Sequence, residues 1–511
     1  MAVPGRAANE LRKSCREPQT PPTHAARHLL RCAATCAARR RRAETRCSAQ
    51  TTDAEVVVIG AGIGGLTAAA MLAKAGRRVV VLESHSIAGG AAHAWKRDGF
   101  TFESGPSLYS GLAARPSPNP LAQVLQALGE ELPVVRYTQW TCHLQPLGTY
   151  LTDVGSPDKF ERVLAHQADG GEAIRQWRAL CAAMGPLSSA AVAIPAAAVR
   201  ADAGAILTLA RFLPRLAAAP LALPQLIQPF SSILRRYNIT HPFLLQWMDM
   251  LCFLLSGCPA SGTITVEIAF MFADWFTPNS ALEFPLGGSG ALVDALVRGL
   301  TKHGGVLRTS SHVERVLVEN GRAAGVRLRG GDVLRATAAV ISNASIWDTL
   351  PLLPPGALPP AWAATAESTP QCDSFVHLHL GIDAAGLPPG LGLHHISTEN
   401  WAAPIDSPQN LVLTSIASVA DPSLAPPGHH TVHAYTPGTE PSSLWAGLKR
   451  GSVEYEDLKR ERSQVIFSIF FIFFHFFRFS CAVRRRFCGA RWRRPSRTRG
   501  SVLKSRWWAR R

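Results

Sequence analysis

The sequence predicts an α/β protein in which a parallel-stranded βαβ unit is joined to a second, α+β domain, with the segments of the two interleaved along the chain. The first observation is the stretch from Ala54 to Ser84, which reads as strand, glycine turn, Ala/Leu-rich helix and strand. The second is that strand and helix patterns return after residue 280, beyond a long helical stretch. With 511 residues and 47% apolar content, the chain can bury more than one core.

The net charge of +17 is concentrated at the two ends of the chain. Residues 1–50 hold 11 Lys and Arg against 3 Asp and Glu, residues 465–511 hold 13 against none, and the remainder therefore carries −4. A mildly acidic body offers no continuous surface for phosphate backbones, which argues against nucleic-acid binding. The five cysteines between the two ends show no CxxC pair or other metal-ligand spacing, so we expect reduced, buried thiols.

Residues 1–52 are rich in Ala and Arg, poor in acids, and without an apolar core long enough for a secretory signal. This composition is typical of an organelle transit peptide that is removed before folding, and a disordered basic arm is the alternative. Composition alone does not distinguish plastid from mitochondrion.

The glycine turn inside the βαβ unit predicts a dinucleotide site. Gly60, Gly62 and Gly65 form GxGxxG, in which the first permits the tight turn, the second lets the backbone approach a pyrophosphate, and the third allows close helix packing. The helix that follows would direct its free N–H groups at the phosphates. Glu83 ends the second strand, where a carboxylate can accept hydrogen bonds from ribose hydroxyls. Strand, turn, helix, strand and terminal acid in register make this prediction specific.

A second glycine loop follows at Gly89 and Gly90, and then an extended aromatic stretch, GFTFESGPS. A nicotinamide-binding domain would continue with further βα units, so a second approach of the backbone to the cofactor is the better interpretation. The arrangement resembles the flavin-dependent amine oxidase and phytoene desaturase superfamily, whose aromatic-rich strand ends in an acid and a glycine, here Glu103 and Gly105. The resemblance implies FAD, bound by a Rossmann-like domain of the glutathione-reductase type.

Later segments resemble the carotenoid isomerase (prolycopene isomerase) branch of that superfamily, and the similarity runs from about residue 54 to about 464. They are Ala281–Leu350, Phe375–Ile382, Thr398–Asp406 and Asp421–His430. The resemblance implies isomerisation of poly-cis carotenes such as prolycopene, in the chloroplast (plastid), with peripheral contact to the plastid membrane. A carotene desaturase is the alternative within enzymes, and an inactive carotenoid or flavin binder is the alternative outside them.

The fingerprint and the resemblance together define the predicted FAD site. Val313 lies on the strand that, in such flavoproteins, touches the adenine through its backbone. The later GGSG cluster at Gly287–Gly290 lacks a third glycine, and we interpret it as a loop before a helix, so only one dinucleotide site is supported. The predicted cofactor-binding residues are Gly60, Ala61, Gly62, Gly64, Gly65, Glu83, Ser84, Gly89, Gly90, Ala91 and Val313.

The predicted organisation has six parts. Residues 1–52 are the transit peptide, 53–150 and 284–349 the two parts of the FAD-binding domain, 151–283 a largely helical cap, 350–464 the rest of the substrate domain, and 465–511 an aberrant tail. Between 313 and 328 the alternating pattern with Asn320-Gly321 predicts a hairpin. In the cap, the apolar stretch from Phe243 to Leu255 is shorter than the roughly 20 residues of a membrane span, and a core helix is expected.

No catalytic residue can be named from the sequence. Glu267 and Asp274, with Trp275, lie in an apolar setting that could raise a carboxyl pKa for acid–base work, although structural roles are the commoner explanation. His377 and His379 alternate and therefore share one face of a strand. Without a cysteine or carboxylate at metal spacing they predict no metal site.

The phenylalanine-rich run that begins at Val465 does not read as part of the protein. Val465 to Phe477 is too short for a membrane anchor, and its phenylalanines occupy every face of a helix, which argues against a core helix. Valine codons begin with GT, as most introns do, and a T-rich intron would spell Phe and Ile. We therefore expect 465–511 to be a translated intron or a gene-model error. The family's glycine-rich closing segment, which resembles GDSxxPGxG, does not occur in the sequence.

Overall fold

The computed structural model describes residues 53–475 apart from 106, 118, 194–221, 372 and 389, and of residues 470–475 it describes only the helical path. The chain divides into two compact units, Met1–Asp53 and Ala54–Arg511, and all that follows concerns the second. The predicted transit peptide and the tail beyond residue 475 lie outside the described residues.

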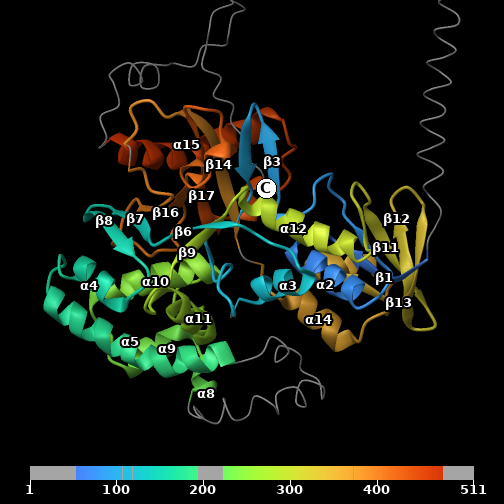
Figure 1. Cartoon of the computed structure of the whole chain (residues 1–511), viewed down its shortest axis with the longest axis horizontal. Helices are drawn as coiled ribbons and strands as arrows, with labels where there is room; N and C mark the ends of the chain where they lie inside the picture. The colour runs from blue at the N-terminus through green and yellow to red at the C-terminus, as the bar shows by residue number, and fades with distance from the viewer. Residues whose placement is uncertain are drawn as a thin grey trace, which may run out of the picture. The chain divides into compact units, whose positions relative to one another are not determined.

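The first sheet has six strands in the order β10-β2-β1-β13-β12-β11. Figure 1 labels β1, β13, β12 and β11 of this sheet. β1 pairs in parallel with β2 and β13, β2 pairs in parallel with β10, and β12 and β11 continue the sheet as an antiparallel hairpin. The strands are β1 (Ala54–Ile59), β2 (Val79–Leu82), β10 (Val306–Arg308), β11 (Val313–Glu319), β12 (Arg322–Leu328) and β13 (Val333–Ser342). The predicted hairpin is confirmed: Asn320 and Gly321 join β11 to β12 with φ of 50° and 74°.

Both faces of the parallel strands are buried. Val56, Val58, Val79 and Val81 face a core shared with three helices, α2 (Ile63–Lys74), α3 (Pro120–Leu128) and α12 (Gly288–Lys302). The alternate residues, Val57, Ile59, Val80 and Leu82, pack with residues of β11, β12 and β13. Continuous runs of valine suit strands buried on both sides. The Rossmann-like fold predicted for this part of the chain is confirmed.

The second sheet is mixed and also has six strands, in the order β14-β17-β16-β15-β7-β8. The strands are β7 (Gln139–Leu144), β8 (Gly148–Asp153), β14 (Ser374–Asp383), β15 (His394–Thr398), β16 (Leu411–Ser415) and β17 (His429–Glu440). β15 and β7 are parallel, whereas the other neighbours are antiparallel. The predicted boundary at residue 150 falls inside β8, so the β7–β8 hairpin, expected in the first FAD-binding segment, belongs to the second sheet.

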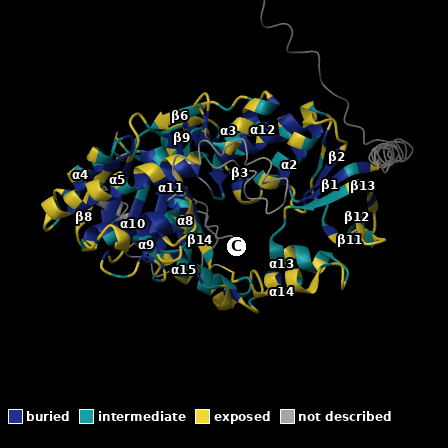
Figure 2. Ribbon diagram, turned by 90° about the horizontal axis from the view of Figure 1, so that it is seen from below, coloured by how far each residue is buried: buried dark blue, intermediate teal, exposed yellow. Residues whose placement is uncertain are grey.

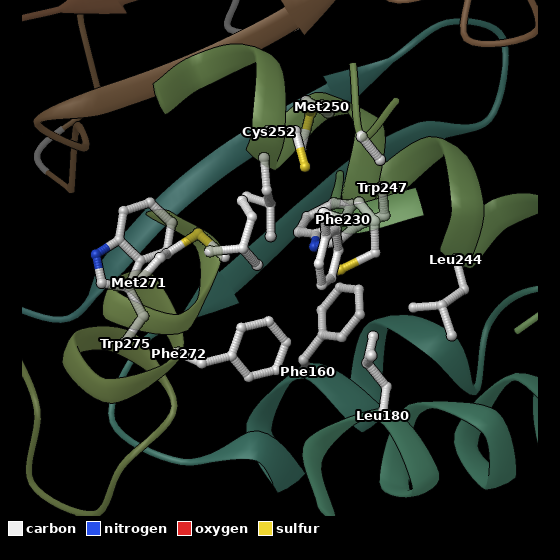
Figure 3. Close-up of a cluster of buried hydrophobic side chains, with 14 of the residues drawn as sticks. Phe160, Leu180, Phe230, Leu244, Trp247, Met250, Cys252, Met271, Phe272 and Trp275 are labelled. Carbon is white, nitrogen blue, oxygen red and sulfur yellow. The ribbon is translucent and has the colours of Figure 1, made fainter. Parts of the chain in front are cut away.

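A helical cap packs against the β7–β8 end of this sheet. Its helices are α4 (Pro157–Leu164), α5 (Gly170–Ala193), α8 (Leu223–Leu226), α9 (Phe230–Arg236), α10 (Pro242–Ser256) and α11 (Thr265–Trp275). Figure 3 shows the aromatic core that they enclose, in which Phe160 and Trp247 lie 4.5 Å apart between ring centroids. Figure 2 shows that buried residues dominate α10, as expected of a core helix. In the part of the chain that the structure describes, every helix is too short or too polar to cross a bilayer.

Two small sheets connect these parts. One pairs β3 (Ala94–Arg97) with β4 (Phe100–Glu103), and the other has the order β5-β9-β6, with β5 (Tyr109–Ser110), β6 (Val134–Tyr137) and β9 (Leu282–Pro285). The remaining short elements are η1 (Gly90–Ala92), α13 (Ile346–Thr349), η3 (Leu350–Leu352), α14 (Pro360–Ser368), η4 (Ala417–Val419), η5 (Pro422–Leu424) and η6 (Ser442–Trp445).

The last described element, α15 (Val453–His475), runs across the predicted break at residue 465. Ile466 and Ile469 are buried against Leu378 of β14 and Val432 of β17. The prediction that this stretch makes no core helix is therefore wrong for its first turns, because two isoleucines three residues apart present one apolar edge to the sheet. The origin of residues 465–511 stays a prediction.

Candidate functional site

The loop between β1 and α2 has the geometry of a phosphate-binding turn. Gly60 has φ +93°, a conformation that favours glycine. A Cβ atom built on Gly65 would lie 2.2 Å from the carbonyl oxygen of Gly60, so only glycine allows the helix to start this close to the strand. Gly62 precedes α2, and no side chain caps the N–H groups of its first turn. Those groups remain available to an anionic ligand.

Asn343, at the end of β13, lies against the same loop. Its backbone N–H donates to the carbonyl oxygen of Ile59 at 2.8 Å. Cβ atoms built on Gly62 and Gly64 would lie 2.9 Å and 2.7 Å from the amide group of the Asn343 side chain. The glycines therefore accommodate Asn343 as well as a ligand. Sequence reasoning did not include Asn343 in the site, although it closes the strand next to β1.

Glu83 is buried at the end of β2, where its carboxylate organises the loop. One carboxylate oxygen accepts from the backbone N–H of Ala61 at 2.8 Å, and the other accepts from the N–H of His85 at 2.8 Å and from the Ser84 hydroxyl at 3.3 Å. A carboxylate offers about four acceptor positions. About one remains, so the geometry leaves room for the ribose hydroxyl, whose contact with Glu83 stays a prediction.

The second glycine loop lies directly beside the first. Gly89 donates its N–H to the carbonyl oxygen of Ala61 at 2.8 Å and forms an isolated parallel bridge with Gly62. A Cβ atom on Gly90 would lie 3.0 Å from the Cα of Gly62, so the two backbones approach as only glycines allow. Ala91 O accepts from the Ser104 hydroxyl at 2.9 Å. The two glycine loops are separated in the sequence, but in the structure they form one unit.

The chain before β11 reaches the same edge of the sheet. Ser311 donates its N–H to the carbonyl oxygen of Glu83 at 2.7 Å, and Ser310 donates to that of His85 at 2.9 Å. Val313 follows as a buried residue at the start of β11. The structure thus brings Val313 near the ribose-binding end of the predicted site, with its side chain in the core.

The second glycine loop and the end of β2 border a cleft of about 440 Å³, a volume within the usual range of ligand pockets. Glu83 and Gly90 line it together with aromatic and imidazole rings from β3 and β14. Its lining residues are Glu83, His85, Ile87, Gly90, Ala91, His93, Trp95, Ser104, Ser374, Phe375, His377 and His379. Glu83 and Gly90 line this cleft, and the first glycine loop, with the uncapped N–H groups of α2, lies against Gly90, an arrangement that fits a dinucleotide. The rings at the far wall were not predicted as site residues.

Glu103 supports the site without lining it. Its buried carboxylate accepts from the N–H of Ser289 at the start of α12, and burial raises the pKa of this carboxyl. Asp421 accepts from the N–H of Gly287 at 2.7 Å, one residue before α12. Carboxylates are favourable at helix N-termini because they satisfy free N–H groups. Both acids therefore fix the P-x-Gly-Gly turn.

The acid–base candidates of the cap do not line the cleft. Burial raises the carboxyl pKa of both Glu267 and Asp274, and Asp274 accepts a hydrogen bond from the Ser110 hydroxyl at 2.7 Å. Trp275 packs in the aromatic core against Trp140. Within the described residues we find no cluster of His, Cys, Asp and Glu suited to a metal ion.

Fold and cleft together define a dinucleotide-binding protein with the two-loop arrangement of flavoproteins. Comparison with known proteins gives the same class. Residues 63–456 match the family described as flavin containing amine oxidoreductase. The chain belongs to this family, and to its carotenoid isomerase-like branch, and its cofactor is FAD.

Individual relatives agree with this placement. A chloroplastic prolycopene isomerase 1 from an Oncidium hybrid cultivar is 32% identical over 419 residues, which cover 79% of this chain and 67% of that protein. A lycopene-forming phytoene desaturase from Pseudescherichia vulneris is 27% identical over 399 residues, covering 75% and 76%. The chain spans 63–67% of the length of the plant prolycopene isomerases that it matches.

A solved structure confirms the fold. An oxidoreductase from Methanosarcina mazei superposes with a TM-score of 0.54 and 20% identity, covering 80% of this chain and 83% of that one.

Proposed function

We propose that the chain is an FAD-dependent isomerase that converts poly-cis carotenes, such as prolycopene, to trans forms without net redox change. The similarity to plant prolycopene isomerases over 79% of the chain carries this proposal. When bound, FAD supplies reversible electron transfer, which can lower the double-bond character of a polyene bond.

The protein's own residues would hold the cofactor and exclude water. We propose that the uncapped N–H groups of α2 and the glycines of both loops bind the pyrophosphate. Glu83 would accept a ribose hydroxyl, and the backbone before Val313 would lie beside the adenine. Ser84 lies next to Glu83 and donates to its carboxylate, which orients the acid.

The direct test uses the full chain with FAD kept reduced and a poly-cis carotene dispersed in detergent. Chromatography with mass detection follows the polyene. We expect trans products of unchanged mass. A substrate that remains untouched although FAD is bound would overturn the proposed activity.

A carotene desaturase is the second candidate, favoured by the similarity to a phytoene desaturase over 75% of the chain. Desaturation removes hydrogen, so each new double bond lowers the mass and moves absorption to longer wavelength. The same assay, run with oxidised FAD and an electron acceptor, separates the two activities. A loss of mass would favour the desaturase.

We also propose a plastid location with peripheral membrane contact. Plant relatives named chloroplastic support the location. For the contact, the cap exposes Leu223, Ile227, Ile264 and Phe270, with Ile227 77% exposed. Ile264 bridges to Pro229, which places it near the turn that carries Ile227. Contiguous exposed apolar patches mark interaction surfaces, and we propose that these side chains form one.

Flotation with galactolipid vesicles tests this contact. We expect Ile227→Asp with Ile264→Asp to reduce co-flotation, whereas Val453→Asp, at an exposed residue of α15, should not. Equal flotation of all three proteins would show that the cap does not bind the membrane. For the location, a fluorescent protein fused after residue 52 should enter plastids.

A further inference from the structure

Rings of β3 and β14 form the far wall of the cleft, and they continue as a stack into the buried ring of His433, which does not line the cleft itself. We use "ring row" for Trp95, His379, His433 and His377. Trp95 of β3 meets His379 edge-on, with 4.7 Å between ring centroids. His379 stacks on His433 at 4.5 Å with 6° between the planes, and His433 stacks on His377 at 5.1 Å. Three strands from two sheets therefore contribute to one surface.

The register of β14 and β17 creates the row. His379 lies directly opposite His433 in the antiparallel pair, and His377 follows two residues before His379 on the same face. The alternate residues Val376 and Leu378 face the other side and pack in the core that includes α15. Cross-strand ring pairs are a regular source of sheet stability, but only this face of β14 borders the cleft.

Hydrogen bonds inside the protein fix most of these rings. His379 Nε2 lies 2.8 Å from the carbonyl oxygen of Glu103 and therefore donates to it. His377 Nδ1 and His433 Nε2 are 2.8 Å apart and share one proton. The second nitrogen of His377, Nε2, has no hydrogen-bond partner among the residues that the structure describes, although the side chain lines the cleft.

Two imidazoles of the row, His377 and His433, are hard to protonate. Burial, and then the neighbouring His379, lowers the pKa of His377 to about 3, and burial lowers the pKa of His433 well below its ordinary value. Groups so hard to protonate are poor proton carriers at neutral pH. The row offers a ligand uncharged ring surfaces and one hydrogen-bonding nitrogen.

We propose that the ring row is the wall against which the flavin ring of bound FAD lies, with His377 Nε2 hydrogen-bonded to a polar atom on its edge. A hydrocarbon polyene would pack on the rings but leave Nε2 without a partner. The flavin ring has both a conjugated face and polar edge atoms. Glu83 and Gly90 line the same cleft as His377, so one molecule can occupy both ends. This inference rests on the proposed FAD site.

The test is titration of the full chain with FAD, followed by flavin absorbance and fluorescence. His377→Phe keeps a ring and removes the nitrogen, so we expect FAD to bind about 5- to 10-fold more weakly, the effect of one hydrogen bond, with a shifted absorption band. Trp95→Leu removes an indole that would quench the flavin, so bound FAD should fluoresce more strongly. His429→Asn, at an exposed position of β17, serves as the matched control and should match the wild type.

Each outcome decides the inference. Wild-type affinity and spectrum in His377→Phe would overturn it, as would unchanged flavin fluorescence in Trp95→Leu, which also serves if the first variant fails to fold. A wild-type chain that binds no FAD would overturn the inference together with the proposed function. A chain that binds FAD against these rings yet leaves poly-cis carotenes unchanged would overturn only the proposed activity.

Discussion

Mild acid should destabilise this protein strongly because several buried histidines cannot be protonated in the fold. Burial lowers the pKa of His143, His377 and His394 to about 3 each, with a neighbouring histidine as the second cause, and lowers that of His433 well below 6.5. In the unfolded chain each would titrate near 6.5. The folded pKa is the lower one, so this contribution to stability is complete above about pH 6.5 and is lost as pH falls toward 3.

The magnitude follows from the difference between folded and unfolded pKa. At pH 5.5, one unit below the unfolded pKa, each histidine that stays neutral in the fold costs about 1.4 kcal/mol. Four such residues cost about 5.6 kcal/mol, comparable with the whole stability of many domains, about 5–15 kcal/mol. Buried carboxyls with raised pKa, such as Glu103, act in the opposite direction, since the folded chain takes up their protons first.

Urea unfolding at pH 7.5 and pH 5.5, followed by tryptophan fluorescence, measures this loss. The variant with His377→Phe and His433→Phe keeps the carboxyls and removes two of the four imidazoles. Its free energy of unfolding should therefore fall by about 2.8 kcal/mol less than that of the wild type between the two pH values. His429→Asn should leave the difference unchanged. If the double variant loses as much stability as the wild type, the imidazoles titrate normally in the fold and the reasoning is wrong.

Three substitutions test other parts of the structure. Glu83→Gln keeps the shape and an acceptor but loses the charge, so FAD should bind about tenfold or more weakly in an absorbance titration, since charge-assisted hydrogen bonds are the stronger ones. Gly65→Ala would force a carbon against the first turn, so the unfolding free energy should fall by about 1–3 kcal/mol, whereas Gly171→Ala, with open space around it, should cost nothing in the same urea titration. Ile466→Ala should cost about 2–5 kcal/mol by thermal or urea unfolding, and the exposed Ser468→Ala next to it should be neutral, a difference that disappears if α15 does not pack on the sheet.

The sequence predicted the glycine loops and Glu83 because a βαβ unit encodes its site within about 30 consecutive residues. Its backbone conformation, pairing and terminal acid all follow from local pattern. The ring row has no such local code. His433 meets His379 only through the register of two strands some fifty residues apart. Trp95 meets His379 only because β3, in its own small sheet with β4, lies beside β14. A pair of alternating histidines showed a shared face but not what that face would meet.

The segment that begins at residue 465 shows that composition alone does not reveal which face of a helix will be buried. Eight phenylalanines in a short run made every face of the helix look equivalent, and helix amphipathicity gave no signal. In the fold, the face that is buried is the one that carries Ile466 and Ile469, which pack against apolar residues of the second sheet. Arg462, one turn earlier, is held by the buried carboxylate of Glu440 at 2.6 Å, which sets the rotation of the helix before the isoleucines begin.

β14 therefore links the C-terminal helix α15 to the cleft. On one face its Val376 and Leu378 depend on α15 for burial, and on the other its His377 and His379 form the wall of the cleft. A strand with one face uncovered would lose the free energy of burying those apolar side chains, and the register that aligns His379 with His433 would lose its support. Through the core face of β14, the segment from 453 to 469 thus stabilises the strand that carries the surface on which the proposed flavin contact depends.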